Sequence, residues 1–150
     1  MKNIVVVDAS VALKWVIEEE DSDKALALLE EWDKAGITMI APPLLAYEVT
    51  NILYQNVRKG EISRFKARQA LKDILQAELE FDMPQNVELN LQALEFAFDF
   101  SLRATYDPHY LALAEREDCD LWTADARLWR AVQKKYPRVR LLADYQPPTS

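Results

Sequence analysis

The 150-residue sequence has little of what builds disulfides, thiolate metal sites or membrane spans. It contains one cysteine, Cys119, and one histidine, His109. A single cysteine excludes a disulfide framework and a metal site made of several thiolates, and it suits a reducing compartment. The N-terminal apolar run ends at Asp8 and is too short for a secretory signal, and no other apolar run is long enough to cross a bilayer. We therefore expect a cytoplasmic protein.

Positive charge is also scarce. The chain has 18 Lys and Arg against 25 Asp and Glu, a net charge of -7. The molecule as a whole is therefore not a general polyanion binder, and a contact with nucleic acid needs a local basic patch or bound cations. Residues 57–72 form such a patch, because Glu61 is the only acid among its basic side chains.

Short β-type runs alternate with helical runs along the chain. Four β-branched residues at 4–7 are typical of a strand buried on both faces, as in the centre of a parallel sheet. This alternation, with connections long enough for crossovers, predicts an α/β fold with a parallel sheet and helices on both faces. We expect one domain over residues 1–150, with a flexible tail from about residue 144. Further strands are expected at 37–40, 79–83, 121–123 and 139–142, and helices at 11–16, 25–34, 42–59, 63–77, 86–102, 107–117 and 126–135.

Four acids stand in apolar or sparsely charged surroundings: Asp8, Glu48, Asp107 and Asp125. Asp8 and Asp125 each follow a buried strand, which is where open α/β sheets place their ligand sites. Glu48 is expected inside a helix, facing inward or into a cleft, and Asp107 at the start of one. A carboxylate in such a setting is costly unless it is paired, hydrogen-bonded or coordinating a cation.

Each acid also has a structural interpretation. Asp107 and Asp125 are suited to cap the helices that follow them, and Glu48 could pair with a neighbouring Lys or Arg. Asp8 is harder to explain in this way, because a cap at that point would usually be left to Ser10.

A fold that aligns strand ends and helix starts along one edge would bring the four carboxylates together. At about 4 Å and an effective dielectric near 20, each like-charge contact costs on the order of 4 kcal/mol, which protonation or a divalent cation relieves. All the candidate ligands are oxygens, and there is no cluster of Cys or His. The sequence therefore favours Mg²⁺ or Mn²⁺ over Zn²⁺.

Four segments, in order along the chain, resemble the acidic motifs of PIN domains: VDASV at 7–11, YEVTN at 47–51, YDPHYLALA at 106–114 and TADARL at 123–128. Similarity is greatest to the VapC-type toxins of prokaryotic toxin-antitoxin pairs, and it covers essentially the whole chain. It implies a PIN-like three-layer α/β/α sandwich around a central, mostly parallel sheet of about five strands.

The resemblance also implies an activity and partners. It implies a divalent-metal-dependent endoribonuclease, with Asp8, Glu48, Asp107 and Asp125 as the catalytic and metal-binding residues and Mg²⁺ or Mn²⁺ as the cofactor. It further implies a homodimer and a small antitoxin protein that occupies the active-site groove.

Other residues are assigned supporting roles. Ser10 and Thr123 match hydroxyl positions that accompany the acids in the family. Lys14 and Arg127 lie close in sequence to two of the acids, and Arg58 belongs to the basic patch; we expect these three cations to contact RNA phosphates.

Several alternatives stay open. His109 could approach a phosphate or lie exposed on its helix, and Pro108 with His109 departs from the small or apolar residues of many relatives. A signalling receiver would need an adjacent acidic pair on the first strand, and a haloacid-dehalogenase-like phosphatase would need a second acid at Ser10. The stronger rival is a PIN scaffold with weak catalysis that binds RNA or a protein.

Overall fold

A five-stranded sheet forms the centre of the computed structural model, which describes residues 3–83 and 86–149. Every strand pairing in it is parallel. The strand order is β3-β2-β1-β4-β5, with β1 (Ile4–Val7) in the middle, β2 (Thr38–Ala41) and β3 (Leu79–Phe81) on one side, and β4 (Leu121–Thr123) and β5 (Val139–Leu141) on the other. The parallel sheet and its central strand confirm the sequence prediction.

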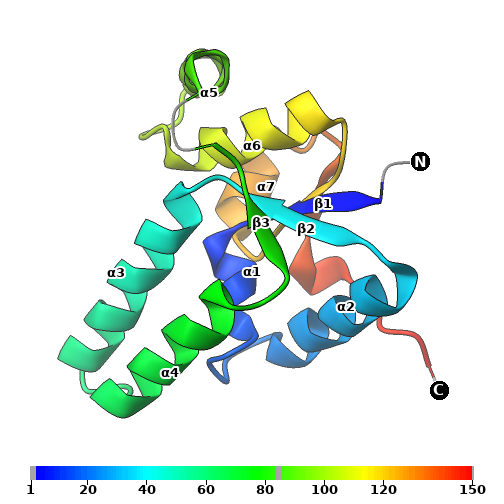
Figure 1. The fold of residues 1–150 in the computed structure, drawn as a ribbon. Helices are drawn as coiled ribbons and strands as arrows, with labels where there is room; N and C mark the ends of the chain where they lie inside the picture. The colour runs from blue at the N-terminus through cyan, green and yellow to red at the C-terminus, as the bar shows by residue number, and fades with distance from the viewer. Residues whose placement is uncertain (1–2, 84–85, 150) are drawn as a thin grey trace.

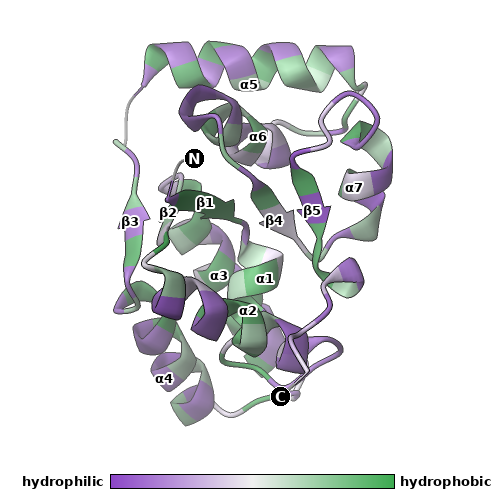
Figure 2. Cartoon of the chain, turned by 90° about the vertical axis from the view of Figure 1, so that its right-hand side faces the viewer, coloured by the Kyte–Doolittle hydropathy of each residue, from purple (hydrophilic) through white to green (hydrophobic). Residues whose placement is uncertain are grey.

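Helices cover both faces of this sheet, as the three-layer prediction requires (Figures 1 and 2). One side carries α2 (Ser22–Ala35), α3 (Leu44–Arg58) and α4 (Arg64–Leu75), and the other carries α5 (Val87–Asp99) and α6 (Tyr106–Glu117). The short α1 (Ala9–Lys14) follows β1, and α7 (Ala126–Val132) packs beside β4 and β5.

The strand order reverses at β1. The chain first builds outward through β2 and β3, then returns to the other side of β1 for β4 and β5. The crevice at such a reversal, beyond the C-terminal ends of the strands, is the usual ligand site of open α/β sheets. The topology therefore places the segments after β1 and β4 side by side at that position.

Local signals set most of the helix starts. Ser63 caps α4 and Asn86 caps α5, each by accepting a backbone hydrogen bond, at the residues where the expected helices 63–77 and 86–102 begin. The start of α1 differs from the expected 11–16, because Asp8 itself is the cap and accepts a hydrogen bond from the Val11 N–H at 3.2 Å. The expectation that Ser10 would take the capping role at this point was wrong.

At the C-terminal end, Tyr145 is part of the packed structure. Its ring lies edge-on to Trp122 with centroids 5.9 Å apart, and its hydroxyl donates to Glu31 at 2.7 Å. A flexible tail stays a prediction for the residues that follow Tyr145. Within the described parts of the chain, no helix has the length and apolar character needed to cross a membrane.

Two residues of α3 allow a test of the packing. Leu45 is fully buried, whereas Ile52 on the same helix is partly exposed. We expect Leu45→Ala to lower the free energy of unfolding by about 2–5 kcal/mol, because it leaves a cavity in the core. Ile52→Ala should cost about 1 kcal/mol at most. Urea unfolding monitored by circular dichroism measures both, and equal costs would contradict this orientation of α3.

Candidate active site

The end of the central strand carries a buried carboxylate. Asp8 lies in the turn between β1 and α1 and is only 4% exposed. Its backbone N–H donates to the carbonyl oxygen of Trp122 on β4 at 3.3 Å, which holds the ends of the two strands together. Asp125 begins α7 just beyond β4, so the structure places these two strand-end acids in adjacent turns.

Two hydroxyls connect those turns. The Ser10 Oγ donates to Asp8 Oδ1 at 2.5 Å and accepts the Ala124 N–H at 2.8 Å. The Thr123 Oγ1 accepts the Asp125 N–H at 3.0 Å and lies 3.5 Å from the Ser10 Oγ. The β1–α1 turn is thus fastened to the β4–α7 turn through side chains that also orient the acids.

Glu48 reaches the same region from α3. Its Oε1 accepts a hydrogen bond of 2.6 Å from the hydroxyl of Tyr110 on α6, so its partner is a tyrosine and not the Lys or Arg considered from the sequence. Burial and the charge of Glu48 raise the pKa of Tyr110, which keeps its hydroxyl protonated as a donor. Sequence analysis gave Tyr110 no role. The available signal was its position three residues after Asp107, which puts both on one side of a helix.

The remaining two acids differ in their relation to helix starts. Asp125 caps α7 by accepting hydrogen bonds from the N–H groups of Arg127 and Leu128, at 2.9 and 3.3 Å. Asp107 does not cap α6, because that helix begins at Tyr106 after Thr105, and Asp107 lies within its first turn. The helix dipole still favours a carboxylate there. Among the described residues, no hydrogen bond or ion pair holds the Asp107 side chain.

Asp107 is the electrostatic centre of the four acids. Burial raises the pKa of Asp8 from 3.8 to about 7, and the charge of Asp107 adds to the rise. Burial and then Asp107 likewise raise the pKa of Glu48, and burial and then Asp125 raise that of Asp107. Repulsion therefore links Asp107 to each of the other three acids, and a divalent cation would offset this repulsion.

The cluster has the donor chemistry for a hard cation, although its geometry is open. All four acids offer oxygens, the ligands that Mg²⁺ and Mn²⁺ prefer. In the part of the chain that the structure describes, no three His, Cys, Asp or Glu side chains lie close enough together to hold a metal ion. The carboxylates would have to approach one another to share one.

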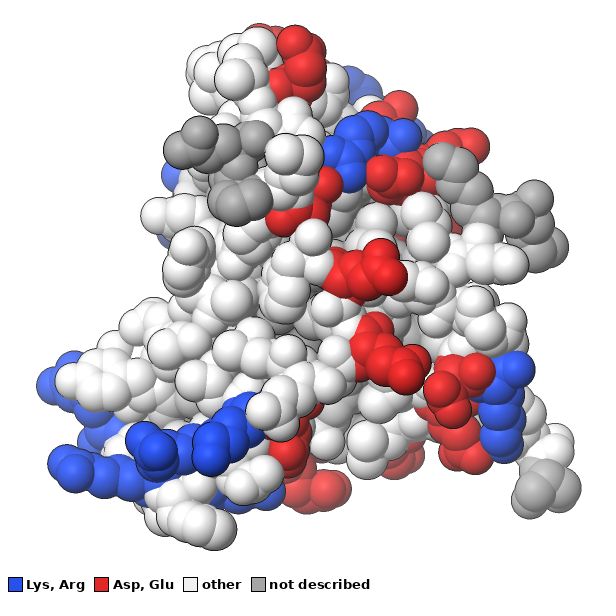
Figure 3. Space-filling model, viewed as in Figure 1, with Lys and Arg blue, Asp and Glu red and all other residues white. Residues whose placement is uncertain are grey.

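The three predicted phosphate-binding cations occupy different places. The Lys14 Nζ donates to the carbonyl oxygen of Glu20 at 2.7 Å, so its charge is directed to the α1–α2 connection. Arg58 ends α3, ten residues and about 15 Å along the helix axis from Glu48. Figure 3 shows Lys and Arg gathered over that end of α3 and α4. Arg127 is exposed in the first turn of α7, two residues after Asp125.

His109 connects two helices. Its Nδ1 lies 2.5 Å from the carbonyl oxygen of Thr105, and its Nε2 lies 3.1 Å from Oδ1 of Asn90 on α5. The side chain thus fastens α5 to the first turn of α6, beside Asp107. His109 is therefore not a freely exposed helix residue, and its contact with a phosphate stays a prediction.

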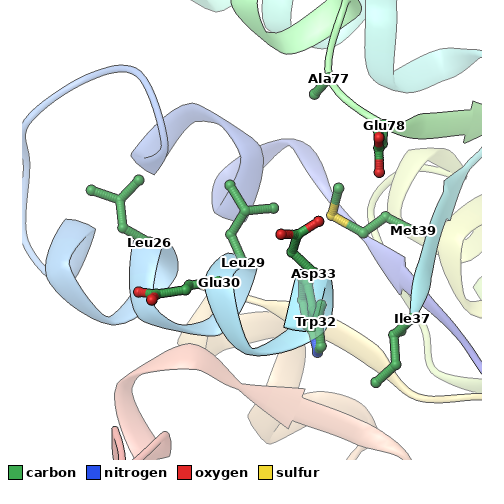
Figure 4. Close-up of a pocket in the computed structure, with 9 residues that line it drawn as sticks. All are labelled: Leu26, Leu29, Glu30, Trp32, Asp33, Ile37, Met39, Ala77 and Glu78. Carbon is green, nitrogen blue, oxygen red and sulfur yellow. The ribbon is translucent and has the colours of Figure 1, made fainter. Parts of the chain in front are cut away.

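Two hollows in the described surface lie away from the acids. One of about 350 Å³ lies between α2 and the α4–β3 connection, and another of about 680 Å³ lies beside Trp32, Trp122 and Tyr145. The first is lined mostly by α2 and the start of β2 (Figure 4), and none of the four acids lines either hollow.

The raised pKa of Asp8 predicts how stability depends on pH in chelator. Because the folded pKa of about 7 lies above the unfolded 3.8, folding is favoured by the protonated form. The contribution of Asp8 to the free energy of unfolding is therefore complete below pH 4. It decreases as the pH rises from 4 to 7 and is lost above that. We expect Asp8→Asn to be more stable than the wild type at pH 8, by up to about 4 kcal/mol, and nearly equal to it at pH 4.

Thermal unfolding at the two pH values measures this difference. Asp23→Asn, at an exposed acid in the first turn of α2, is the control and should show no pH-dependent gain. A less stable Asp8→Asn at pH 8 would contradict the interpretation.

Known proteins resemble this chain over most of its length. The PIN domain model matches residues 5–135. Ribonuclease VapC3 of Pyrobaculum aerophilum is 29% identical over 136 residues, which is 89% of this chain and 95% of that protein.

Two solved structures share the fold. VapC20 of Mycobacterium tuberculosis, described as a Sarcin-Ricin loop cleaving toxin, has a TM-score of 0.64 and 18% identity, over 85% of this chain and 94% of that one. VapBC2 of Rickettsia felis, bound to a DNA fragment from its promoter, has a TM-score of 0.64 and 15% identity, over 92% and 96%. The family model matches most of the chain, including all four acids, and the chain therefore belongs to the PIN domain family.

Proposed function

We propose that this chain is a divalent-metal-dependent endoribonuclease that acts in the cytoplasm as the toxin of a toxin-antitoxin pair. Its catalytic centre is the cluster of Asp8, Glu48, Asp107 and Asp125. The observation that carries the proposal is that burial and repulsion by a neighbouring acid raise the pKa of three of these carboxylates, which come from the β1–α1 turn, α3 and α6. A bound cation relieves that cost. Similarity to Ribonuclease VapC3 over nearly its whole length supports the choice of RNA as the substrate.

The four acids would hold Mg²⁺ or Mn²⁺. Such an ion, when bound, lowers the pKa of water and neutralises charge on a phosphate. The protein contributes orientation: Ser10 and the Val11 N–H engage Asp8 Oδ1, which leaves Oδ2 for a ligand. Tyr110 engages Glu48 Oε1 and leaves Oε2 in the same way.

The reaction is hydrolysis of a phosphodiester bond. Water attacks the phosphorus, the bond to the 3′ oxygen breaks, and that oxygen takes a proton. The products therefore carry a 5′-phosphate and a 3′-hydroxyl. Arg127 and the basic end of α3 and α4, which includes Arg58, would contact phosphates along an RNA strand. Their exposure supports this role.

Partners belong to the same proposal. A small antitoxin protein would cover the acid cluster, and the chain would form a homodimer. The VapBC2 structure supports the first of these, because it shows the fold in a toxin-antitoxin system.

One observation favours a second function, a PIN scaffold with weak catalysis that binds RNA or a protein. The described carboxylates are not close enough together to hold a metal ion. Cleavage assays separate the two functions.

The nuclease proposal predicts metal-dependent RNA ends. Purified protein, freed of any bound partner, is incubated with total cellular RNA in Mg²⁺ or Mn²⁺ and then in chelator, and new 5′-phosphate ends are sequenced. We expect Asp8→Asn and Asp107→Asn to reduce these ends by roughly 100-fold or more, because each removes charge from the site.

The control Asp23→Asn should cleave like the wild type. New 5′-hydroxyl ends would contradict the mechanism. An absence of new ends would favour the binding scaffold.

Metal binding should also be visible without RNA. At a Mn²⁺ concentration about 100 times its dissociation constant, we expect the folded state to gain about 2.7 kcal/mol. Asp107→Asn should lose most of that gain, because Asp107 acts on both Asp8 and Glu48. Thermal unfolding with and without Mn²⁺ measures the gain, and an equal gain in wild type and variant would place the ion elsewhere.

A further inference from the structure

Helix α3 presents two aromatic rings to the outside. Tyr47 is 73% exposed and Tyr54 is 60% exposed, although side chains of this size usually bury most of their area. At 100° per residue, both rings fall within a sector of about 60° around the helix axis that also contains the exposed Asn51 and Arg58. We call these four residues the α3 stripe.

The α3 stripe leads from the acid cluster to the basic patch. It begins one residue before Glu48 and ends at Arg58, where α3 itself ends, about 16 Å further along the axis. In Figure 3, Lys and Arg side chains gather over that end of α3 and α4. All six cations of this region are exposed: Arg58, Lys59, Arg64, Lys66, Arg68 and Lys72.

These cations are available to a ligand. The ion pairs that join described residues of the chain involve Lys and Arg side chains elsewhere in the fold, and none of these six. Glu48 is the only acid of α3. The stripe therefore combines exposed rings with positive charge that the described chain leaves unpaired.

We propose that the α3 stripe is a stacking surface for unpaired bases of RNA. Tyr47 and Tyr54 each receive the face of one base, while Arg58 and the cations beyond it contact phosphates. Every base has an aromatic face, and exposed rings beside a positively charged groove hold single strands in this way. The two rings arise about 10 Å apart along the helix axis, far enough to receive two different bases.

This chemistry distinguishes unpaired from paired RNA. In a duplex the faces of the bases are covered by their neighbours, so the rings have nothing to stack on, whereas the phosphates remain open to the cations. The stripe therefore adds affinity for single strands alone.

The composition of the stripe favours RNA over a protein surface. An apolar protein partner would require a continuous aliphatic surface, but the two tyrosines are separated by Asn51 and followed by Arg58. Ile52 is the nearest exposed aliphatic residue of α3, and only 36% of it is exposed. Rings interleaved with polar and basic side chains match a polyanion with aromatic groups.

This inference rests on the proposed ribonuclease and adds a surface that holds its substrate. Binding is measured by fluorescence anisotropy on the full chain, freed of any bound partner, with Asp8→Asn in every sample so that binding is measured in Mg²⁺ without cleavage. The probe is a labelled oligoadenylate of about twelve nucleotides, used as a single strand and then paired with oligouridylate.

Loss of a ring should weaken binding of the single strand. We expect Tyr47→Leu and Tyr54→Leu each to raise the dissociation constant at least about fivefold. The double variant should show the product of the two effects, because the rings are well separated. Tyr54→Phe keeps the ring and should bind like the parent protein. None of these changes should alter binding of the paired probe.

Salt dependence separates stacking from charge. Arg58→Gln should reduce the slope of the logarithm of affinity against the logarithm of salt concentration by about 0.7, because one phosphate contact is lost. Tyr54→Leu should leave this slope unchanged, since stacking releases no counterions. Phe98→Leu is the matched control: Phe98 is 66% exposed on α5, a helix without Lys or Arg, and its replacement should change neither affinity nor slope.

Two results would overturn the proposal. Equal dissociation constants for Tyr54→Leu and Tyr54→Phe would show that the ring does not stack and would indicate a protein as the occupant of the stripe. An equal effect of Tyr54→Leu on single-stranded and paired probes would show that the ring does not read unpaired bases.

Cleavage of total RNA by the chain with Asp8 intact keeps this proposal apart from the nuclease. Ring-dependent binding without cleavage would refute the nuclease and support the stacking surface. Cleavage together with an unchanged dissociation constant in Tyr54→Leu would refute the stacking surface alone.

Discussion

The site depends on a carboxylate buried at the end of the central strand. Asp8 is desolvated, yet it is anchored by the Ser10 hydroxyl and by the backbone of α1. Because its pKa lies near neutrality, Asp8 without a cation carries only part of a charge at physiological pH. A buried acid of this kind lowers the free energy of unfolding at high pH. Carboxylates with strongly raised pKa values are found most often at functional sites.

Each of the other acids is positioned relative to that carboxylate by a different means. Asp125 is held by the helix that it caps, and Glu48 by the phenol of Tyr110. Asp107 is held by its helix alone, since its side chain has no bonded partner among the described residues. Asp107 is thus the least restrained of the four carboxylates, and its charge raises the pKa of both Asp8 and Glu48. A side chain with this freedom is suited to move into place when a metal or a substrate binds.

Much of this arrangement could be predicted from the sequence, because it follows from short-range signals. Runs of β-branched residues mark strands, and Ser63 and Asn86 mark helix starts. The strand-end acids converge because parallel strands end at one edge. The partner of Glu48 could not be predicted, since Tyr110 lies 62 residues away and the contact depends on how α3 and α6 pack. The contact of Lys14 could not be predicted either. Its sequence position near Asp8 suggested a contact with RNA phosphates, whereas in the fold its Nζ donates to the carbonyl oxygen of Glu20.

The bond network of His109 has a mechanical consequence. Along the chain, the first turn of α5 and the first turn of α6 are separated by more than ten residues, including the loop between the two helices. Through space, a single imidazole joins Asn90 to Thr105, at the base of the turn that bears Asp107. Through these contacts, a displacement of α5 is passed to the first turn of α6, which carries the least restrained of the four acids.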